Sequence, residues 1–487
     1  MILPKIKLYF LLVCIGFLSL LTSCSTLRTR SGGSGHYVKA SRIGLISNDV
    51  SAAKRNATKL ANYVNRGYGI VVDNVYYVGK SDENIEKNFL LKGKPKGQLI
   101  MTTRLSWTVV RPVAIHISGV SISTKLTVLP SSQFRLIENS GCNYHPSVII
   151  ESCAIDGVRI YSHVALDVDQ VQNKDGVRRF EFKNNVVSNM GLYVVRLTNC
   201  LCEEAFIMDN EISNFKSIVF GLNVTNGFRE LGFSRMKKVY FSGNKINNAG
   251  FVLDDSYDYE YIYHTPITVE SEFCECKNNV IENILCAQDN PIAVYPFYLS
   301  GASVVISGNK ITDCLNLVNS SNNEFFKCKQ SEGRPAERLI ENNICVVTKD
   351  CLKRKSHGDM PYIKLCGLQM QRIKSAIIKN NNINVACDFV FGAPMQCEYD
   401  YFEFSGNTIK YNDIGAKAKQ LLRLLPSSTS SGEINIFNNN MESVVKPTSL
   451  FALFDYDYTG YSIEVYNNRL SGTLPYGSIS GALYSPT

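Results

Sequence analysis

The sequence predicts an all-β fold of about twelve stacked coils of short strands, with a short helical cap at the N-terminal end. Ten asparagines recur about every 31 residues through most of the chain, and apolar residues stand at fixed distances on both sides of each. No helical periodicity fills the intervals between them. The composition agrees, because 45% hydrophobic and 19% charged residues exclude a disordered chain and a coiled coil.

Residues 1–23 are predicted to be a secretion signal, because two lysines precede an apolar run over residues 8–21 that is short for a membrane span. The run ends in Leu21-Thr22-Ser23-Cys24, which resembles the lipobox of bacterial lipoproteins, where cleavage precedes a cysteine that carries the lipid. The resemblance implies a lipid on Cys24 and a lipid anchor in a bacterial membrane of the cell envelope, with the outer membrane favoured. The alternative is an ordinary signal peptide with an incidental cysteine.

Residues 24–40 hold the cysteine and a stretch without apolar periodicity, which is expected to form a flexible tether. Residues 50–64 then show an amphipathic pattern that predicts a helix, with Asn48 or Asp49 as its N-cap and its end near Gly67.

Apolar runs after this helix predict the first strands, at residues 69–72, 75–78 and 89–93. We therefore expect an N-terminal cap and first coils over residues 41–110 and the repeat domain over residues 111–487. A cap is physically required, since an open end would expose apolar side chains and unpaired strand edges.

Each repeat predicts a strand, a tight corner and a second strand. Apolar residues stand three positions before and two positions after every reference asparagine, and an Asn, Asp or Gly that tolerates a left-handed backbone usually comes directly before it. Five positions before, the residue is apolar except for Glu337. The reference residues are Asn185, Asn210, Asn244, Asn279, Asn309, Asn342, Asn381, Asn407, Asn439 and Asn468.

With this pattern, the chain resembles the right-handed parallel β-helix (pectate-lyase-like) superfamily, whose members carry an internal asparagine ladder at one corner. The resemblance covers about residues 110–475 and is specific for architecture. It implies stacked amides at the corner and, in the enzymes of the superfamily, a substrate groove formed by the third strand of each coil and its flanking loops. It does not fix the chemistry, because one fold hosts many activities.

The chain has sixteen cysteines, which raises the question of disulfide bonds or a metal site. Cys274 and Cys276 fall in the apolar columns and should point inward as small hydrophobic residues, and Cys153 takes an asparagine's place in an early coil. No C-x-x-C pair occurs, so no zinc site is expected. Buried free thiols are favoured, with one or more disulfides as the alternative.

Three acidic and tyrosine-rich clusters and one basic loop fall where the groove would lie. Tyrosine rings stack on sugars, paired carboxylates serve as acid and base or hold Ca²⁺, and basic groups neutralise uronate carboxylates. The candidates for substrate binding are Asp254, Asp255, Tyr257, Tyr259, Tyr399, Asp455 and Tyr456, and the candidates for catalysis are Lys353, Arg354, His357 and Asp400.

In an elimination reaction, Lys353 or His357 would remove the proton beside a carboxylate, and Arg354 would stabilise the developing charge. Motifs of the polygalacturonase-like hydrolases are incomplete, so a lyase is favoured over a hydrolase. No cofactor is expected other than Ca²⁺. The competing interpretation is that these loops have no functional role and only cover the coils, with their charged groups and amphipathic tyrosine rings exposed to solvent.

The sequence therefore predicts a cell-envelope lipoprotein whose β-helix binds an acidic polysaccharide, and it leaves open whether the protein also cleaves this polysaccharide by elimination. The alternative is a non-catalytic surface adhesin or structural scaffold. A nucleic-acid partner is not expected, because a net charge of +8 is modest for this length and the chain is expected to be secreted.

Overall fold

The structure is a computed structural model of the whole chain. It describes residues 36–124, 134–139, 144–164, 176–191, 193–198, 201–215, 219–222, 236–249, 263–264, 267–286, 293–294, 296–316, 326–329, 336–348, 363–364, 371–385, 391–392, 397–411, 420–424, 431–443, 449–453, 460–472 and 479–480. Tyr37–Thr487 forms one compact unit. The predicted signal and Cys24 lie outside the described residues. In the described part, no helix is long and apolar enough to cross a membrane.

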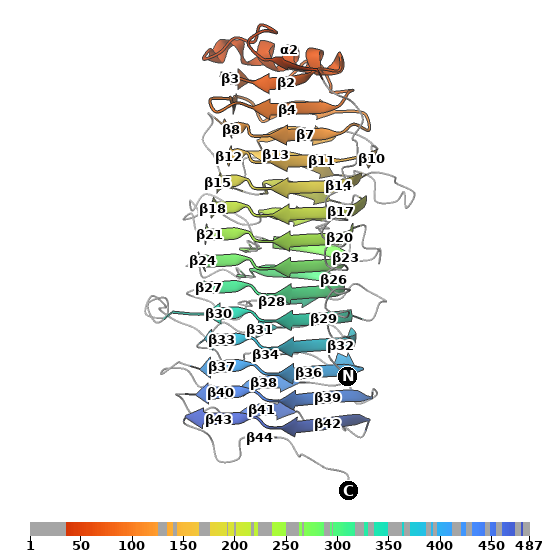
Figure 1. Cartoon of the computed structure of the whole chain (residues 1–487), viewed down its shortest axis with the longest axis vertical. Helices are drawn as coiled ribbons and strands as arrows, with labels where there is room; N and C mark the ends of the chain where they lie inside the picture. Colours follow the sequence, from red (N-terminus) through yellow and green to blue (C-terminus); the bar gives the residue numbers. More distant parts are fainter. Residues whose placement is uncertain are drawn as a thin grey trace, which may run out of the picture. The chain divides into compact units, whose positions relative to one another are not determined.

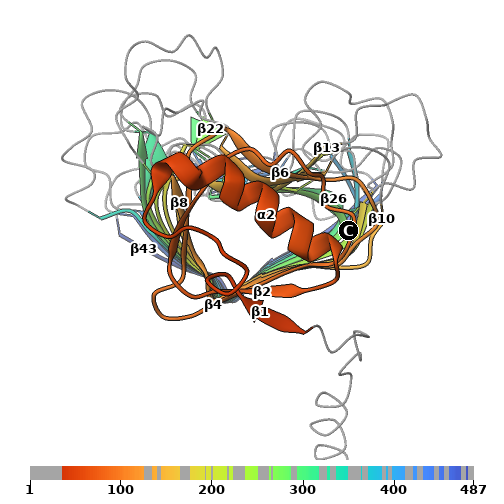
Figure 2. The same ribbon diagram turned by 90° about the horizontal axis from the view of Figure 1, so that it is seen from above.

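Every pairing between strands is parallel, and successive coils stack along one axis (Figure 1). The predicted right-handed parallel β-helix is confirmed. Each coil presents a first, a second and a third face, and the three faces surround the core when viewed along the axis (Figure 2). The second face is a 14-stranded sheet with one strand per coil, so the repeat runs slightly further than the predicted twelve coils.

The first face precedes the corner of each coil. Its strands are β2 (Gly69–Val72), β4 (Phe89–Gly93), β7 (Ile115–Ser118), β11 (Val148–Glu151), β14 (Gly176–Lys183), β17 (Leu201–Met208), β20 (Met236–Ser242), β23 (Ile267–Lys277), β26 (Phe297–Ser307), β29 (Ala336–Glu341), β32 (Gln371–Lys379), β36 (Tyr401–Ser405), β39 (Gly432–Phe437) and β42 (Tyr461–Tyr466). Three shorter strands pair at its edges: β1 (Tyr37–Lys39), β10 (Tyr144–His145) and β35 (Cys397–Tyr399).

The second face follows the corner. Its strands are β3 (Val75–Val78), β5 (Gln98–Met101), β8 (Ser121–Thr124), β12 (Ala154–Asp156), β15 (Val186–Met190), β18 (Glu211–Phe215), β21 (Lys245–Ala249), β24 (Val280–Cys286), β27 (Lys310–Asn316), β30 (Ile344–Val346), β33 (Asn382–Val385), β37 (Thr408–Tyr411), β40 (Asn440–Ser443) and β43 (Arg469–Gly472).

The third face returns the chain to the next coil. Its strands are β6 (Leu105–Val109), β9 (Arg135–Asn139), β13 (Arg159–Val164), β16 (Val195–Thr198), β19 (Phe220–Leu222), β28 (Phe326–Lys329), β31 (Ile363–Lys364), β34 (Phe391–Gly392), β38 (Gln420–Leu424), β41 (Ser449–Leu453) and β44 (Ile479–Ser480). The first residues of β23 and β26 complete it, and these two strands continue into the first face. A separate pair, β22 (Tyr263–His264) and β25 (Ala293–Val294), lies beside the coils.

The predicted cap is a 3-10 turn, η1 (Val50–Ala52), followed by the helix α2 (Ala53–Asn65), which lies across the N-terminal end of the stack (Figure 2). Of the two predicted N-caps, Asp49 takes the role, since its carboxylate accepts from the Ser51 N–H at 2.8 Å. The helix ends near Gly67, as predicted, and this glycine adopts a left-handed backbone with φ +91°. The indole N–H of buried Trp107 donates to the Ala57 carbonyl at 3.0 Å and ties the cap to the third face.

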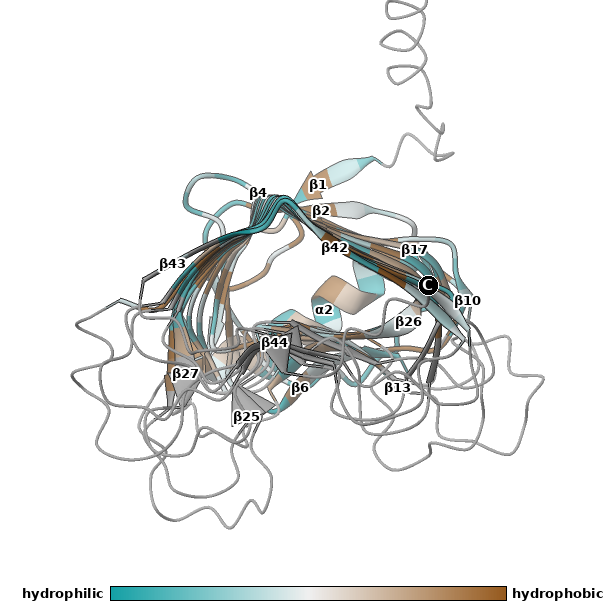
Figure 3. Ribbon diagram, turned by 90° about the horizontal axis from the view of Figure 1, so that it is seen from below, coloured by the Kyte–Doolittle hydropathy of each residue, from teal (hydrophilic) through white to brown (hydrophobic). Residues whose placement is uncertain are grey.

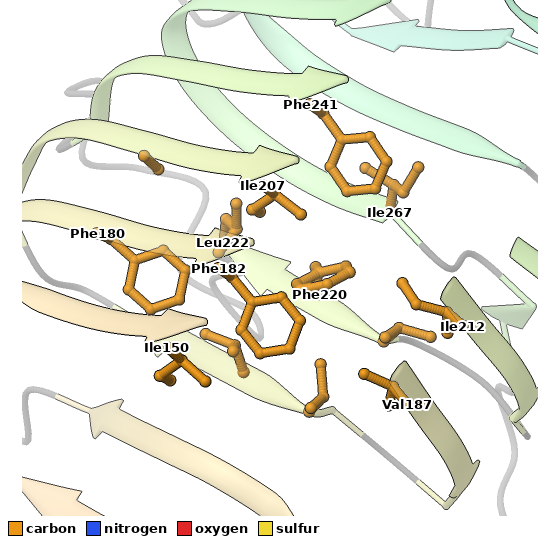
Figure 4. Close-up of a cluster of buried hydrophobic side chains, with 14 of the residues drawn as sticks. Ile150, Phe180, Phe182, Val187, Ile207, Ile212, Phe220, Leu222, Phe241 and Ile267 are labelled. Atoms are coloured by element: carbon orange, nitrogen blue, oxygen red, sulfur yellow. The ribbon is translucent and has the colours of Figure 1, made fainter. Parts of the chain in front are cut away.

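Buried apolar side chains form one continuous cluster inside the coils. Hydrophilic residues gather at the corner between the first and second faces (Figure 3). Phe180 and Phe182 pair in register with Ala205 and Ile207 of the next coil. Across the core, the ring of Phe220 meets Phe182 and Phe241 edge-on, at centroid distances of 5.4 and 5.6 Å (Figure 4). This parallel stacking buries an apolar face that no single coil could bury alone.

The cysteines that the structure describes as free thiols are all buried, as predicted: Cys153, Cys202, Cys274, Cys276, Cys314 and Cys345. Burial raises the pKa of Cys153 to about 11 and that of Cys202 to about 12, so these thiols stay protonated and unreactive at neutral pH.

The corner asparagines form the predicted ladder. Each buried amide accepts from both the backbone N–H and the amide of the asparagine one coil before, as Asn210 does from Asn185 at 3.0 and 3.0 Å. Each amide also donates to a carbonyl of the preceding coil, as Asn210 does to Phe182 at 2.9 Å. One coil before Asn185, the N–H of Cys153 donates to the Oδ1 of Asn185 at 3.0 Å. This bond confirms that Cys153 occupies the ladder position of its coil in place of an asparagine.

One ladder position was predicted wrongly, since Asn343 and not Asn342 occupies it. Asn343 accepts from Asn309 and donates to Asn381, whereas Asn342 is the left-handed residue of the corner, with φ +56°. The shift also moves the exception in the apolar column from Glu337 to Arg338, which pairs with Val304. Arg338 is buried and donates to backbone carbonyls, including Gly301 at 2.8 Å.

A second column of left-handed residues on the second face was not predicted. It stands four positions after the ladder residue in five successive coils and consists of Asn189, Asn214, Asn248, Asn283 and Asp313. Asparagine and aspartate adopt this backbone at lower cost than other side chains do. The signal was present in the sequence at a constant spacing.

Replacing one ladder amide should destabilise the whole stack. Asn279 accepts from the backbone and amide of Asn244 and donates to Phe241 and Asn309, all at 2.9–3.0 Å. Asn279→Ala leaves buried polar groups without hydrogen-bond partners, and each such group costs about 1–3 kcal/mol. We therefore expect the free energy of unfolding to fall by about 3–5 kcal/mol in urea titrations. The control is Asn247→Ala on the exposed second face, which should change it by less than about 0.5 kcal/mol. Equal effects of the two variants would contradict the ladder's energetic role.

Candidate functional site

Most of the predicted site residues lie outside the described residues. These are Asp254, Asp255, Tyr257, Tyr259, Lys353, Arg354, His357, Asp455 and Tyr456. The backbone of Tyr399 ends β35, and Asp400 connects β35 to β36 on the first face. The convergence that the sequence predicted for these groups therefore stays a prediction.

Asp400 is fixed by its backbone between neighbouring coils. Its N–H donates to the Ile373 carbonyl at 2.9 Å, and its own carbonyl accepts from Glu433 at 3.1 Å. Nearby, Lys374 forms an ion pair with Glu337 at 2.8 Å. The pKa of Lys374 is raised by this partner first, with a further contribution from the charge of Asp400. Asp400 therefore lies in a mixed-charge region of the first face.

Two further histidines are both on strands. His116 contacts Glu151 of the next coil at 2.7 Å on the first face. His264 lies on β22 of the small separate pair. Neither position is on a third-face strand.

The strands of the third face place one set of positions in register along the axis. We call this set the third-face row, and it consists of Thr108, Glu138, Ser162, Arg196, Gly221, Thr268, Tyr298, Lys327, Lys364, Gly392, Arg423, Ala452 and Ser480. After Glu138 the row holds four basic residues and no acidic one. Successive strands lie about 4.8 Å apart, so the row runs as a line of backbone positions along the axis.

At the N-terminal end of the row, a group of side chains that we call the Arg–Tyr cluster covers the third face: Arg135, Glu138, Arg159, Ser162, Tyr193 and Arg196. The guanidinium groups of Arg159 and Arg196 lie 5.2 and 5.4 Å from the centre of the Tyr193 ring. That ring lies directly over Gly221, where a Cβ would come within 2.5 Å of it. Glycine at this position is therefore required for the ring to lie flat on the strand.

The charged members of the Arg–Tyr cluster are three arginines and one glutamate. Arg135 forms an ion pair with Glu138, but it also stands directly opposite Arg159 on the neighbouring strand. The pKa of Arg159 is lowered to about 10, mainly because the side chain is buried and further because Arg196 and Arg135 repel its charge. Burial raises the pKa of Tyr193, which the two arginines partly oppose. The cluster therefore concentrates positive charge at one place on the face.

The same strands carry a buried polar network on their inner side. Asn139 Nδ2 lies 3.0 Å from His163 Nδ1, and the hydroxyl of Tyr161 lies 3.3 Å from the same nitrogen. The ring of His145 packs edge-on against His163 at 6.1 Å, and its Nδ1 lies 2.9 Å from the Val113 carbonyl. Burial, and then the neighbouring His145, lowers the pKa of His163 to about 3, so the network is neutral at physiological pH.

Comparison with known proteins gives no relative. No family model, no curated protein and no solved structure matches the chain. In the part that the structure describes, no group of three or more His, Cys, Asp and Glu side chains is placed to hold a metal ion. What the chain binds must therefore be inferred from the side chains of the third face.

The buried histidines should make the fold sensitive to acid. His163 is neutral when folded but takes up a proton below pH 6.5 when unfolded, so the stability is complete above this pH and falls as the pH decreases. At about pH 4.5 the loss should reach about 2.7 kcal/mol for His163, and burial of His145 adds to it.

The measurement is urea unfolding at several pH values. His163→Leu, which matches Leu197 in the same inward column, should reduce the slope of stability against pH. The control His116→Gln leaves both buried histidines in place and should keep the slope. An unchanged slope in His163→Leu would show that other groups cause the acid sensitivity.

Proposed function

We propose that this chain is a cell-envelope lipoprotein whose β-helix binds an acidic polysaccharide along the third face. The observation that carries the proposal is the third-face row, in which Arg196, Lys327, Lys364 and Arg423 share one register without an intervening acid. A linear polyanion laid along the axis would meet these groups in succession. Their common sign favours an anionic partner over a neutral one.

A glycan fits this surface better than a nucleic acid does. Tyr298 lies in the row, and tyrosine is an amphipathic side chain suited to contact with a sugar ring. The basic positions are spread over many coils, and the net charge of +8 is modest for 487 residues. The predicted secretion signal places the chain where surface polysaccharides occur.

Cleavage by elimination is the catalytic part of the proposal. A base removes the proton from the carbon beside a uronate carboxylate, a carbon–carbon double bond forms, and the glycosidic oxygen leaves and takes up a proton. Lys353 or His357 would be the base, with Arg354 stabilising the developing charge and Asp400 as a further candidate for proton transfer. The rival is a non-catalytic adhesin or scaffold that uses the same elongated surface.

The two functions are separated by incubating the purified protein with pectin, alginate and glycosaminoglycans and following the ultraviolet absorbance of unsaturated products. A rise with any substrate, abolished in a Lys353→Ala/His357→Ala variant, supports a lyase. Binding of a polysaccharide without any absorbance change would leave the adhesin and remove the catalytic proposal.

Reversing charge in the third-face row should weaken binding. The double variant Lys327→Glu/Lys364→Glu places two acids at paired positions of β28 and β31, and we expect the affinity for the acidic polysaccharide to fall about tenfold or more. The matched control is Lys410→Glu on the second face, where the lysine pairs with Glu442 at 3.2 Å. Equal losses would indicate a non-specific charge effect, which excludes a dedicated third-face surface.

The lipid anchor can be tested separately. In cells of a bacterial host, wild-type protein should incorporate labelled fatty acid and partition into the detergent phase, whereas Cys24→Ser should do neither. Fatty-acid labelling that persists in Cys24→Ser would exclude the proposed anchor.

A further inference from the structure

The outer side of the cap helix carries a stripe of basic residues. Residues 37–66 contain six basic residues and one acidic residue, a surplus of five positive charges against a net charge of +8 for the whole chain. The apolar side of α2 packs into the core of the coils, and Arg55, Lys59 and Arg66 follow one another on the opposite side of the helix. Figure 2, which looks onto this end, shows α2 in front of the coils.

The charges of this stripe are not matched by acids in the described part of the chain. Lys54, on the flank of the same helix, forms an ion pair with Asp82 at 2.9 Å. Within the described residues, by contrast, no carboxylate lies within ion-pair distance of Arg55, Lys59 or Arg66. The stripe therefore presents positive charge to whatever lies beyond the end of the stack.

The contacts that the stripe does make leave its charge in place. The Nζ of Lys59 donates to the Gly44 carbonyl at 3.2 Å, and the guanidinium of Arg66 lies 5.1 Å from the centre of the Tyr63 ring. The ring of Tyr63 in turn lies 6.0 Å from that of Tyr68. These contacts orient the basic groups beside aromatic rings without neutralising them.

Exposed apolar side chains gather at the same end. Of the seven most exposed large apolar side chains in the described part of the chain, four belong to residues 37–68: Tyr37, Ile46, Val50 and Tyr68. Together with the three basic residues of the stripe, they form what we call the cap face. Tyrosine and aliphatic side chains among basic groups are typical of surfaces that lie against the headgroups of a membrane.

The chain enters the coils at this end. β1 pairs with β2 beside the cap, and the twelve residues 25–36 separate it from Cys24, the proposed site of the lipid. Such a segment spans at most about 45 Å, whereas the stack of 14 coils is about 60 Å long. The segment contains Arg28 and Arg30 and no acid, so it does not supply the negative charge that the cap face would attract.

We propose that the cap face docks on the anionic phospholipid surface of the membrane that holds the lipid anchor. The anchor rests on the proposed function, whereas the recognition of anionic lipid rests on the cap face alone. Basic groups near such a surface are attracted to its phosphates, and the apolar side chains enter the headgroup region. Docking would direct the axis of the stack away from the membrane and leave the third-face row accessible.

The test uses tryptophan as a reporter of contact with the bilayer. The chain has a single tryptophan, Trp107, which is buried, so a second one reports on its own position. Tyr68→Trp places the reporter in the cap face, and Tyr466→Trp places it on β42 near the far end, at similarly exposed positions of 39% and 44%. The full-length proteins are mixed with vesicles that contain brominated phosphatidylglycerol, or brominated phosphatidylcholine as the neutral comparison. Bromine should quench the reporter of Tyr68→Trp in the anionic vesicles and leave that of Tyr466→Trp unchanged.

Charge reversal then tests the basic stripe. In the Tyr68→Trp protein, Arg55→Glu/Arg66→Glu should shift the equilibrium between docked and undocked cap about tenfold or more toward the undocked form, read from the quenched fraction. Arg55→Gln/Arg66→Gln introduces no acid and should show a smaller shift. The matched control is Lys237→Glu/Lys238→Glu on β20, which makes the same change in net charge at exposed positions of the first face and should keep the quenching.

Each outcome decides the proposal. Quenching of the cap reporter by anionic vesicles, reduced by reversal in the stripe and kept in the control, supports the docking surface. Absence of quenching, equal quenching by neutral vesicles or equal quenching at the far end overturns it. A dimer in analytical ultracentrifugation that dissociates in Arg55→Glu/Arg66→Glu, without quenching, would assign the cap face to a second copy instead.

The proposed function can fail separately. If Cys24 incorporates no fatty acid and anionic vesicles still quench the cap reporter, the anchor fails and the docking surface stands. If fatty-acid labelling and polysaccharide binding are both observed without quenching, the proposed function stands and the docking surface fails.

Discussion

The asparagine ladder is the interaction on which the rest of the structure depends. At each corner, one amide accepts the N–H and amide of the preceding coil and donates to a carbonyl of that coil, so no polar group of the corner is left unpaired inside the stack. This geometry is satisfied only when successive asparagines stand in the same place. The ladder therefore fixes the register of the first two faces, while the segments between the second and third faces are free to vary in length.

This constraint explains why the corner could be predicted and where the prediction failed. The strand, corner and strand lie within a few residues of each other, so their spacing is constant and readable. Asn342 and Asn343 are adjacent, and apolar neighbours surround both, which made either acceptable. The apolar column five positions before could not decide between them, because one register places Glu337 there and the other Arg338, whose guanidinium donates to backbone carbonyls.

The third face could not be aligned from the sequence for the opposite reason. Arg196 follows its ladder residue Asn185 by 11 positions, whereas Thr268 follows Asn244 by 24, so members of one spatial row share no sequence phase. The residue types that suggest chemistry were conspicuous only in the acidic and tyrosine-rich stretches. The basic row consists of single residues in short strands, and only the strand pairing reveals it. The left-handed column from Asn189 to Asp313 had a constant spacing and was simply overlooked.

The stability of the coil and the charge of its outer surface are thus set by different residues of the same strand. In β13, Tyr161 and His163 belong to the buried network, while Ser162 between them is on the opposite side of the strand. Parallel stacking obliges each side chain to lie beside its equivalent in the next coil, so like charges such as Arg135 and Arg159 are brought together once their positions are in register. The ladder and the apolar core hold that register regardless of the repulsion. Like charges can therefore stand in register on neighbouring strands of this fold, and a bound polyanion would offset their repulsion without any rearrangement of the coils.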